Sequence, residues 1–179
     1  MHAEPIAAWV GGALEPVPEV EVHRRGLPHP AVAVFVLRGR RMLIRQRPGA
    51  AYLAPGLWSS AGHAHPLWEE PPERCAARLL DGCPLVAGAG APERRGVAEY
   101  RAPLAGGFLE HERVEVFRLP APPPEEGDAA PAPPPGGPRL PDAIWIDVED
   151  LVAEMRRRAE RFTPWLHAAL TEHAALVLG

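Results

Sequence analysis

The sequence contains no lysine, so all 19 of its Lys and Arg side chains are arginines. This bears on any phosphate-binding role, because lysine commonly binds phosphate as a point charge. Basic residues do not outnumber acidic ones either, and the net charge is −4. A nucleic-acid-binding domain normally carries a basic surface. We therefore expect no nucleic-acid partner.

Cysteines are few, and long apolar runs are missing. Cys75 and Cys83 are too few for a disulfide framework. No apolar run approaches membrane-spanning length, and the first residues include an acid and lack the basic start of a signal peptide. A chain of 179 residues suits one domain with a core of its own. We expect a single domain over residues 1–179, located in the cytoplasm.

The first half of the chain predicts a hairpin followed by a helix. The β-branched apolar run Ala31–Leu37 predicts a buried strand, and Met42–Gln46 predicts its partner after a turn at Arg38–Arg40. A helix is expected over Pro71–Asp81, where two prolines fit the first positions and Gly82 ends it. Before the hairpin we expect a strand-and-turn cap over Ile6–Leu14 and an extended loop over Glu15–His29.

The second half of the chain adds strands, a proline-rich segment and more helices. Strands are expected at Val97–Arg101, Leu109–Leu119 and Ala143–Val148. Ten prolines in Pro120–Pro141 exclude a helix or a central strand, so a flexible loop is expected at about 120–141. Helices are expected from Asp147, and from Thr163–Pro164 to His173. This order predicts an α+β or layered αβα domain.

Histidines and glutamates gather around Tyr52–Pro66 and one later strand. We expect the side chains of His63 and His65 to point to opposite faces of an extended segment, and therefore to have different roles. Glu110 and Glu112 share one face of a strand, and His111 points to the other. Imidazole and carboxylate groups are ligands for Zn²⁺, Mn²⁺ and Fe²⁺. The alternative is an exposed acidic strand with scattered surface histidines.

Several motifs in order make the chain similar to one family. They are H-R-R-G-L-P-H at His23–His29, P-G-L-W at Pro55–Trp58, H-P at His65–Pro66, E-Y-R at Glu99–Arg101, F-L-E-H-E at Phe108–Glu112 and R-F-T-P-W-L at Arg161–Leu166. Together they resemble a type 1 isopentenyl-diphosphate isomerase, a branch of the Nudix fold, from about Trp9 to the last helix without the proline-rich loop. The resemblance implies a Nudix-like αβα sandwich with a mixed sheet and extra C-terminal helices.

The resemblance also implies the members of the site. It places one divalent metal (Mn²⁺, Zn²⁺ or Mg²⁺) on His23, His29, His65, Glu110 and Glu112. It implies that isopentenyl diphosphate becomes dimethylallyl diphosphate by a 1,3-proton shift, with Glu112 and Tyr100 as acid–base residues. Arg47, Trp58 and Trp165 are expected to contact the substrate, and the electron-rich face of Trp165 would stabilise a carbocation-like transition state.

Three departures from the family pattern concern the reaction centre. His63 stands at the position of the family's catalytic cysteine, and an imidazole can exchange protons near neutral pH. Arg78–Cys83 lacks the glutamates that position Mg²⁺ on the diphosphate, which argues against a second metal there. Basic residues of the family correspond to Glu19, Ala51 and Leu79, which should weaken diphosphate binding.

These observations leave two functions open, with a third ranked last. The first is an isopentenyl-diphosphate isomerase in which His63 replaces the cysteine. The second is a non-catalytic or repurposed metal-binding protein of Nudix fold. The third, a nucleoside-diphosphate-type hydrolase, needs the glutamates that are missing around Gly82 and Cys83.

Overall fold

A computed structural model describes residues 5–121 and 143–179. The proline-rich segment, expected to be a flexible loop at about 120–141, lies outside this description except for Pro120 and Ala121. The strands are β1 (Pro5–Val10), β2 (Ala13–Pro18), β3 (His29–Arg38), β4 (Arg41–Gln46), β5 (Trp58–Ser60), β6 (Gly62–Ala64), β7 (Glu93–Pro103), β8 (Leu109–Pro120) and β9 (Ala143–Asp147). The helices are α1 (Glu19–Arg25), α2 (Pro72–Leu80), α3 (Val148–Arg157), α4 (Pro164–Thr171) and α5 (Ala174–Leu178).

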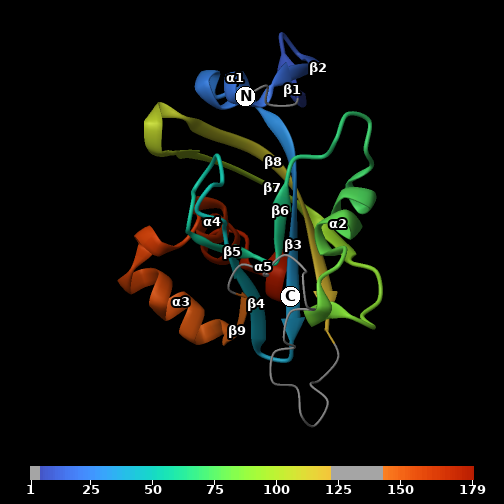
Figure 1. The fold of residues 1–179 in the computed structure, drawn as a ribbon, viewed down its shortest axis with the longest axis vertical. Helices are drawn as coiled ribbons and strands as arrows, with labels where there is room; N and C mark the ends of the chain where they lie inside the picture. Colours follow the sequence, from blue (N-terminus) through green and yellow to red (C-terminus); the bar gives the residue numbers. More distant parts are fainter. Residues whose placement is uncertain (1–4, 122–142) are drawn as a thin grey trace.

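A mixed seven-stranded sheet forms the middle layer. Its main order is β5-β4-β3-β8-β7, while β6 also pairs with β3 and β9 pairs with β4. Only β3 and β8 run parallel among these pairs, since the other ladders of the described sheet are antiparallel. Helix α2 lies on one face, and α3, α4 and α5 lie on the other (Figure 1). The layered αβα arrangement expected from the sequence is therefore confirmed.

Strand β3 shows how the sequence produces these layers. Ala31, Ala33 and Phe35 belong to the core beneath α3–α5, whereas the alternating residues Val32 and Val34 belong to the core beneath α2. Side chains alternate between the two faces of a strand, so a continuous apolar run is what a strand buried on both sides requires. This is why Ala31–Leu37 was recognisable as a buried strand.

The expectation of an extended loop over Glu15–His29 is wrong. Residues Ala13–Pro18 pair with β1 as a hairpin, and Glu19–Arg25 form helix α1. Acids lie in the first turn of α1, arginines lie in its last turn, and Gly26 closes it in the left-handed conformation at φ 62°. These are ordinary helix signals, favourable to the helix dipole and to a glycine C-cap, and the surrounding prolines obscured them.

Other predicted elements are found with small shifts. The helix expected over Pro71–Asp81 is α2, and Asp147 accepts a hydrogen bond from the Glu149 amide at the start of α3. The helix expected to reach His173 ends at Thr171, because His173 precedes the separate short helix α5. Within the described ranges, no helix has both the length and the apolar content needed to cross a membrane.

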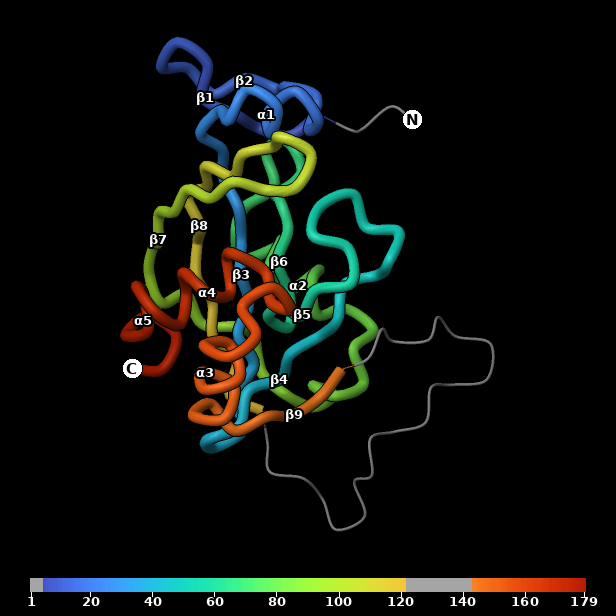
Figure 2. Tube along the Cα trace, turned by 90° about the vertical axis from the view of Figure 1, so that its left-hand side faces the viewer, coloured from blue at the N-terminus to red at the C-terminus, as the bar shows by residue number. Residues whose placement is uncertain are grey.

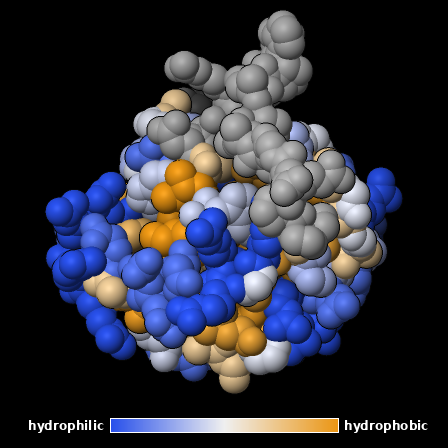
Figure 3. Space-filling view, turned by 90° about the horizontal axis from the view of Figure 1, so that it is seen from below, coloured by the Kyte–Doolittle hydropathy of each residue, from blue (hydrophilic) through white to orange (hydrophobic). Residues whose placement is uncertain are grey.

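The β1–β2 hairpin and α1 cover one end of the sheet. Figure 2 shows them above the start of β3, beside the tip of the β7–β8 hairpin. Ile6, Ala8, Val17 and Val22 form a small core of their own here. Where Figure 3 leaves the opposite end uncovered, hydrophilic side chains surround several apolar patches. The candidate histidines and glutamates lie at the end that the β1–β2 hairpin and α1 cover, where α1, β3, β6 and β8 meet.

Candidate metal centre and active site

Four segments that are distant in sequence supply the site. His23 comes from α1, His29 opens β3, His65 follows β6, and Glu110 and Glu112 lie on β8. The parallel register of β3 and β8 places His29 directly beside Glu112. His23, His29, Glu110 and Glu112 are at most 1% exposed, so the alternative of an exposed acidic strand with scattered histidines is wrong. The expected shared face of Glu110 and Glu112 is confirmed.

Four of the five expected ligands form one tight group. Donor atoms of His23, His29, His65 and Glu110 all lie within 4.8 Å of one another. Glu110 Oε2 lies 3.4 Å from His23 Nε2 and 3.5 Å from His29 Nε2. Buried charges of this kind are costly unless a partner or a cation compensates them. The group has the chemistry of a divalent-metal site.

Each of the three histidines is oriented through its other ring nitrogen. The Nδ1 of His23 donates to the Glu19 carbonyl at 2.8 Å, and the Nδ1 of His29 donates to the Leu27 carbonyl at 2.8 Å. The Nδ1 of His65 donates to the Glu19 carboxylate at 3.1 Å. A ring nitrogen that donates in this way leaves the Nε2 lone pair free, as in most metal-binding histidines.

The free atoms converge and are buried. The Nε2 atoms of His23, His29 and His65 and the Oε2 atom of Glu110 have no hydrogen-bond partner among the described residues. Buried polar groups without partners are rare in proteins, and each calls for an explanation. A divalent cation between these atoms would satisfy them together. The residues present therefore fit a metal.

Glu112 is engaged differently, because His63 binds it. The Nε2 of His63 lies 3.1 Å from each carboxylate oxygen of Glu112, and His65 Nε2 lies 3.5 Å from Oε1. Both histidines thus contact one carboxylate. The expectation that His63 and His65 point to opposite faces is wrong, because residues two apart on an extended segment share a face.

Charges within the site reinforce one another. Burial alone would raise the pKa of Glu112, but the neighbouring His63 and His65 hold that pKa well below its usual range. Burial alone would lower the pKa of His65, but the carboxylates of Glu112 and Glu19 raise that pKa to about 9, so a cation bound at Nε2 would displace a proton from this ring. Burial and the charge of Glu112 raise the pKa of Tyr100 well above its ordinary value. The carboxylates are therefore ionised and the Tyr100 hydroxyl is neutral at physiological pH.

The remaining expected residues lie at different distances from this centre. Tyr100 pairs with Glu112 across β7 and β8, and its buried hydroxyl has no partner among the described residues. Trp165 stacks on His63 with ring centroids 4.7 Å apart, and Arg47 lies 5.1 Å from the centroid of the same indole. Trp58 packs against the core beneath α3–α5 and does not line the cavity that the described residues form at the histidines.

Two residues of the site were missed or misread in the sequence. Glu19 was noted only as a position without a basic residue, yet it orients both His23 and His65. Ser59 accepts a hydrogen bond from the Trp165 indole at 2.7 Å and so fixes the ring under His63. The helix signals of α1 would have placed Glu19 in the first turn, four residues before His23.

A cavity of about 270 Å³ opens onto this centre. Its lining contains the carboxylates of Glu19, Glu110 and Glu112 and the guanidinium of Arg47. Asp81, the only acid left near the end of α2, is exposed and lies outside the lining of this cavity. Leu79 faces Gly62 instead.

Comparison with known proteins agrees with this architecture. The chain is 41% identical over 174 residues to an isopentenyl-diphosphate Delta-isomerase of Dinoroseobacter shibae, covering 97% of this chain and 95% of that protein. It is 40% identical over 177 residues to the isomerase of Rhodobacter capsulatus, covering 99% and 97%. No family model matches the chain.

Solved structures share the fold at low sequence identity. A protein of Deinococcus radiodurans superposes with a TM-score of 0.64 at 12% identity, covering 98% of this chain and 99% of that one. A Nudix hydrolase of Nitrosomonas europaea gives a TM-score of 0.52 at 13% identity, covering 84% and 90%. The fold is that of the Nudix proteins, with a buried His/Glu centre at one end of the sheet. Within this class, the chain belongs to the isopentenyl-diphosphate Delta-isomerase family.

Proposed function

We propose that this protein is a metal-dependent isomerase of isopentenyl diphosphate, in which His63 takes the part of the family's thiol. One observation carries the proposal: three histidine Nε2 atoms and a carboxylate oxygen of Glu110 converge on one buried point without other partners. The family membership supplies the substrate, because relatives at about 40% identity carry the isomerase name.

The separation of the donor atoms suits one divalent cation bound between them. Four ligand atoms around a tetrahedral ion at about 2.1 Å lie about 3.4 Å from one another. The Glu110 oxygen lies 3.4 and 3.5 Å from two of the histidine nitrogens. We therefore assign one divalent cation to His23, His29, His65 and Glu110, and these spacings are compatible with Zn²⁺. A cation held there would neutralise Glu110 and stabilise negative charge on a ligand oxygen.

In this proposal His63 and Glu112 handle the protons. The Nδ1–H group of His63 gives a proton to the terminal carbon of the substrate, the double bond shifts, and Glu112 receives the proton that leaves the second carbon. Tyr100 lies opposite Glu112 in the sheet and is the other acid–base residue of this proposal. Arg47 binds the diphosphate, since it is the arginine that lines this cavity.

The same geometry supports a second candidate function. An alkene between acid and base needs about 7 Å, twice a carbon contact distance of about 3.5 Å. His63 and Glu112 are instead joined at 3.1 Å, and His63 is also stacked on Trp165. Isomerisation requires this pair to separate. If the pair stays closed, the protein is a repurposed metal-binding member of the family.

One experiment separates the two. The purified protein is loaded with Zn²⁺, Mn²⁺ or Mg²⁺, and dimethylallyl diphosphate formed from isopentenyl diphosphate is measured by mass spectrometry. We expect activity in the wild type and its loss in His63→Ala, with folding checked by circular dichroism. An inactive wild type with a full metal complement contradicts the isomerase. Activity gained only in His63→Cys would show a competent pocket that the histidine blocks.

A further inference from the structure

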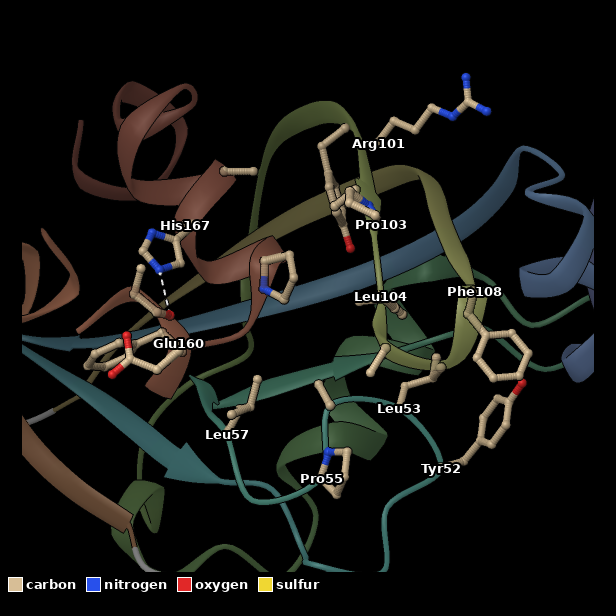
Figure 4. Close-up of a pocket in the computed structure, with 18 of the residues that line it drawn as sticks. Tyr52, Leu53, Pro55, Leu57, Arg101, Pro103, Leu104, Phe108, Glu160 and His167 are labelled. Carbon is tan, nitrogen blue, oxygen red and sulfur yellow. Dashed lines mark hydrogen bonds between the residues drawn. The ribbon is translucent and has the colours of Figure 1, made fainter.

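A second and larger cavity adjoins the candidate site. Its volume is about 820 Å³, against about 270 Å³ at the histidines. It lies between the loop before β5, the tip of the β7–β8 hairpin and the start of α4 (Figure 4). We call it the side groove. A pocket of this size is typical for a drug-sized ligand, and a five-carbon alkenyl group does not need it.

The wall of the side groove is mainly apolar. Leu53, Leu57, Leu104, Phe108 and Phe162 contribute to it. In Figure 4, Leu53 and Leu57 form one side, while the Tyr52 and Phe108 rings lie together at one end. The charged lining residues Arg101, Glu160 and Glu172 are exposed, so they lie at the rim. Such a lining suits a hydrocarbon rather than a charged ligand.

The side groove adjoins the cavity at the metal centre. Tyr52 and Leu53 line both cavities. The Tyr52 ring lies 5.5 Å from Phe108 in the groove and 6.2 Å from the ring of His23 at the centre. Tyr100 also lines the groove and sits opposite Glu112 in the sheet. A ligand whose diphosphate lies at Arg47 would reach the groove past these shared side chains.

The head end offers little attraction for a free diphosphate. Arg47 faces three carboxylates in the lining of the smaller cavity, from Glu19, Glu110 and Glu112. Burial lowers the pKa of Arg47, although the neighbouring glutamates keep it charged. A ligand held mainly at its head would bind weakly here, whereas each methylene buried in the groove would strengthen binding about fourfold.

We propose that the side groove binds the hydrocarbon chain of a prenyl diphosphate longer than five carbons, with the diphosphate at Arg47. The inference rests on the proposed function for the head of this ligand, and on the groove alone for its tail.

The test compares ligands of one head and different tails. Isopentenyl diphosphate and farnesyl diphosphate are titrated by calorimetry into the full chain loaded with Mn²⁺. We expect farnesyl diphosphate to bind at least tenfold more tightly. Ala105→Trp, at an exposed position in the groove lining, should abolish this preference. Ala153→Trp, at an exposed position of α3 outside the groove, should keep it.

The outcomes separate the groove from the reaction. Equal affinity for the two diphosphates, or an unchanged preference in Ala105→Trp, overturns the inference. Tight farnesyl diphosphate binding that Ala105→Trp removes, without any product from isopentenyl diphosphate, supports the groove and contradicts the isomerase. Conversion of isopentenyl diphosphate, together with equal affinity for farnesyl diphosphate, supports the isomerase and contradicts the groove.

Discussion

Glu19 and His65 are joined by a hydrogen bond of 3.1 Å between a carboxylate oxygen and Nδ1. The backbone carbonyl of Glu19 accepts a second bond, of 2.8 Å, from His23. One residue of α1 therefore orients two ligands of the proposed metal centre. Its carboxylate also raises the electron density on the His65 ring, as carboxylates behind metal-binding histidines do.

We predict that Glu19→Ala weakens Zn²⁺ binding by about 10- to 100-fold, because His65 loses the acceptor that fixes its tautomer. Glu19→Gln keeps an acceptor oxygen and should retain most of the affinity. Competition with a chelating dye measures both. Glu15→Gln, at an exposed position of β2, is the matched control and should bind like the wild type. Equal loss in all three variants would contradict the assigned role.

Glu110 and Glu112 should contribute differently to the affinity for the metal. We predict that Glu110→Gln lowers Zn²⁺ affinity at least about 100-fold, roughly 2.7 kcal/mol, whereas Glu112→Gln costs about tenfold or less. The reason is that Glu110 belongs to the four-ligand group while His63 holds Glu112. In the His63→Ala background Glu112 is released, and Glu112→Gln should then cost more. Additive effects of the two substitutions would count against this coupling.

Sequence reasoning recovered the layers and the ligand types but not the contacts among them. The alternating faces of β3 and the shared face of Glu110 and Glu112 follow from strand periodicity, which is a local property. The parallel register that sets His29 beside Glu112 depends on two strands about 80 residues apart. The sequence does not encode it in any local pattern.

The errors at the site have specific causes. Helix α1 was missed because prolines before it outweighed its acidic start, basic end and glycine cap. Without this helix, Glu19 stood out only as a position where the family has a basic residue, and its contact with His65 was not expected. His63 and His65 were expected on opposite faces, but side chains two positions apart on an extended strand point to the same face. The bond from His63 to Glu112 could not be predicted, since it joins segments 49 positions apart.

Gly62 should be needed where β6 packs against α2. A Cβ atom added at Gly62 would lie 2.8 Å from Cβ of Leu79, which is closer than packed carbons allow. We predict that Gly62→Ala lowers the free energy of unfolding by about 1–3 kcal/mol, as overpacking does in cores. Urea denaturation measures this. Gly49→Ala meets no atom within 4 Å and should have little effect. A fully stable Gly62→Ala variant would show that α2 moves freely.

Glu70 and Arg78 form an ion pair that fixes the segment after His65. Arg78 donates to the two Glu70 oxygens at 2.8 and 2.6 Å, and the Leu67 amide donates to one of them at 2.9 Å. The bond from Arg78 is the main reason that the pKa of Glu70 falls to about 2. A carboxylate whose pKa is lowered on folding adds stability that is complete above its unfolded pKa of 4.5 and is lost as the pH falls towards 2.

We therefore predict that Glu70→Gln lowers the free energy of unfolding by about 1 kcal/mol at pH 6, since the exposed side of Arg78 weakens the pair. The difference between wild type and Glu70→Gln should shrink by about half at pH 3. Urea denaturation at both pH values measures it. Glu69→Gln removes the neighbouring exposed charge and should differ from the wild type by less at pH 6. A Glu70→Gln difference that stays constant or grows as the pH falls would contradict an ionic origin.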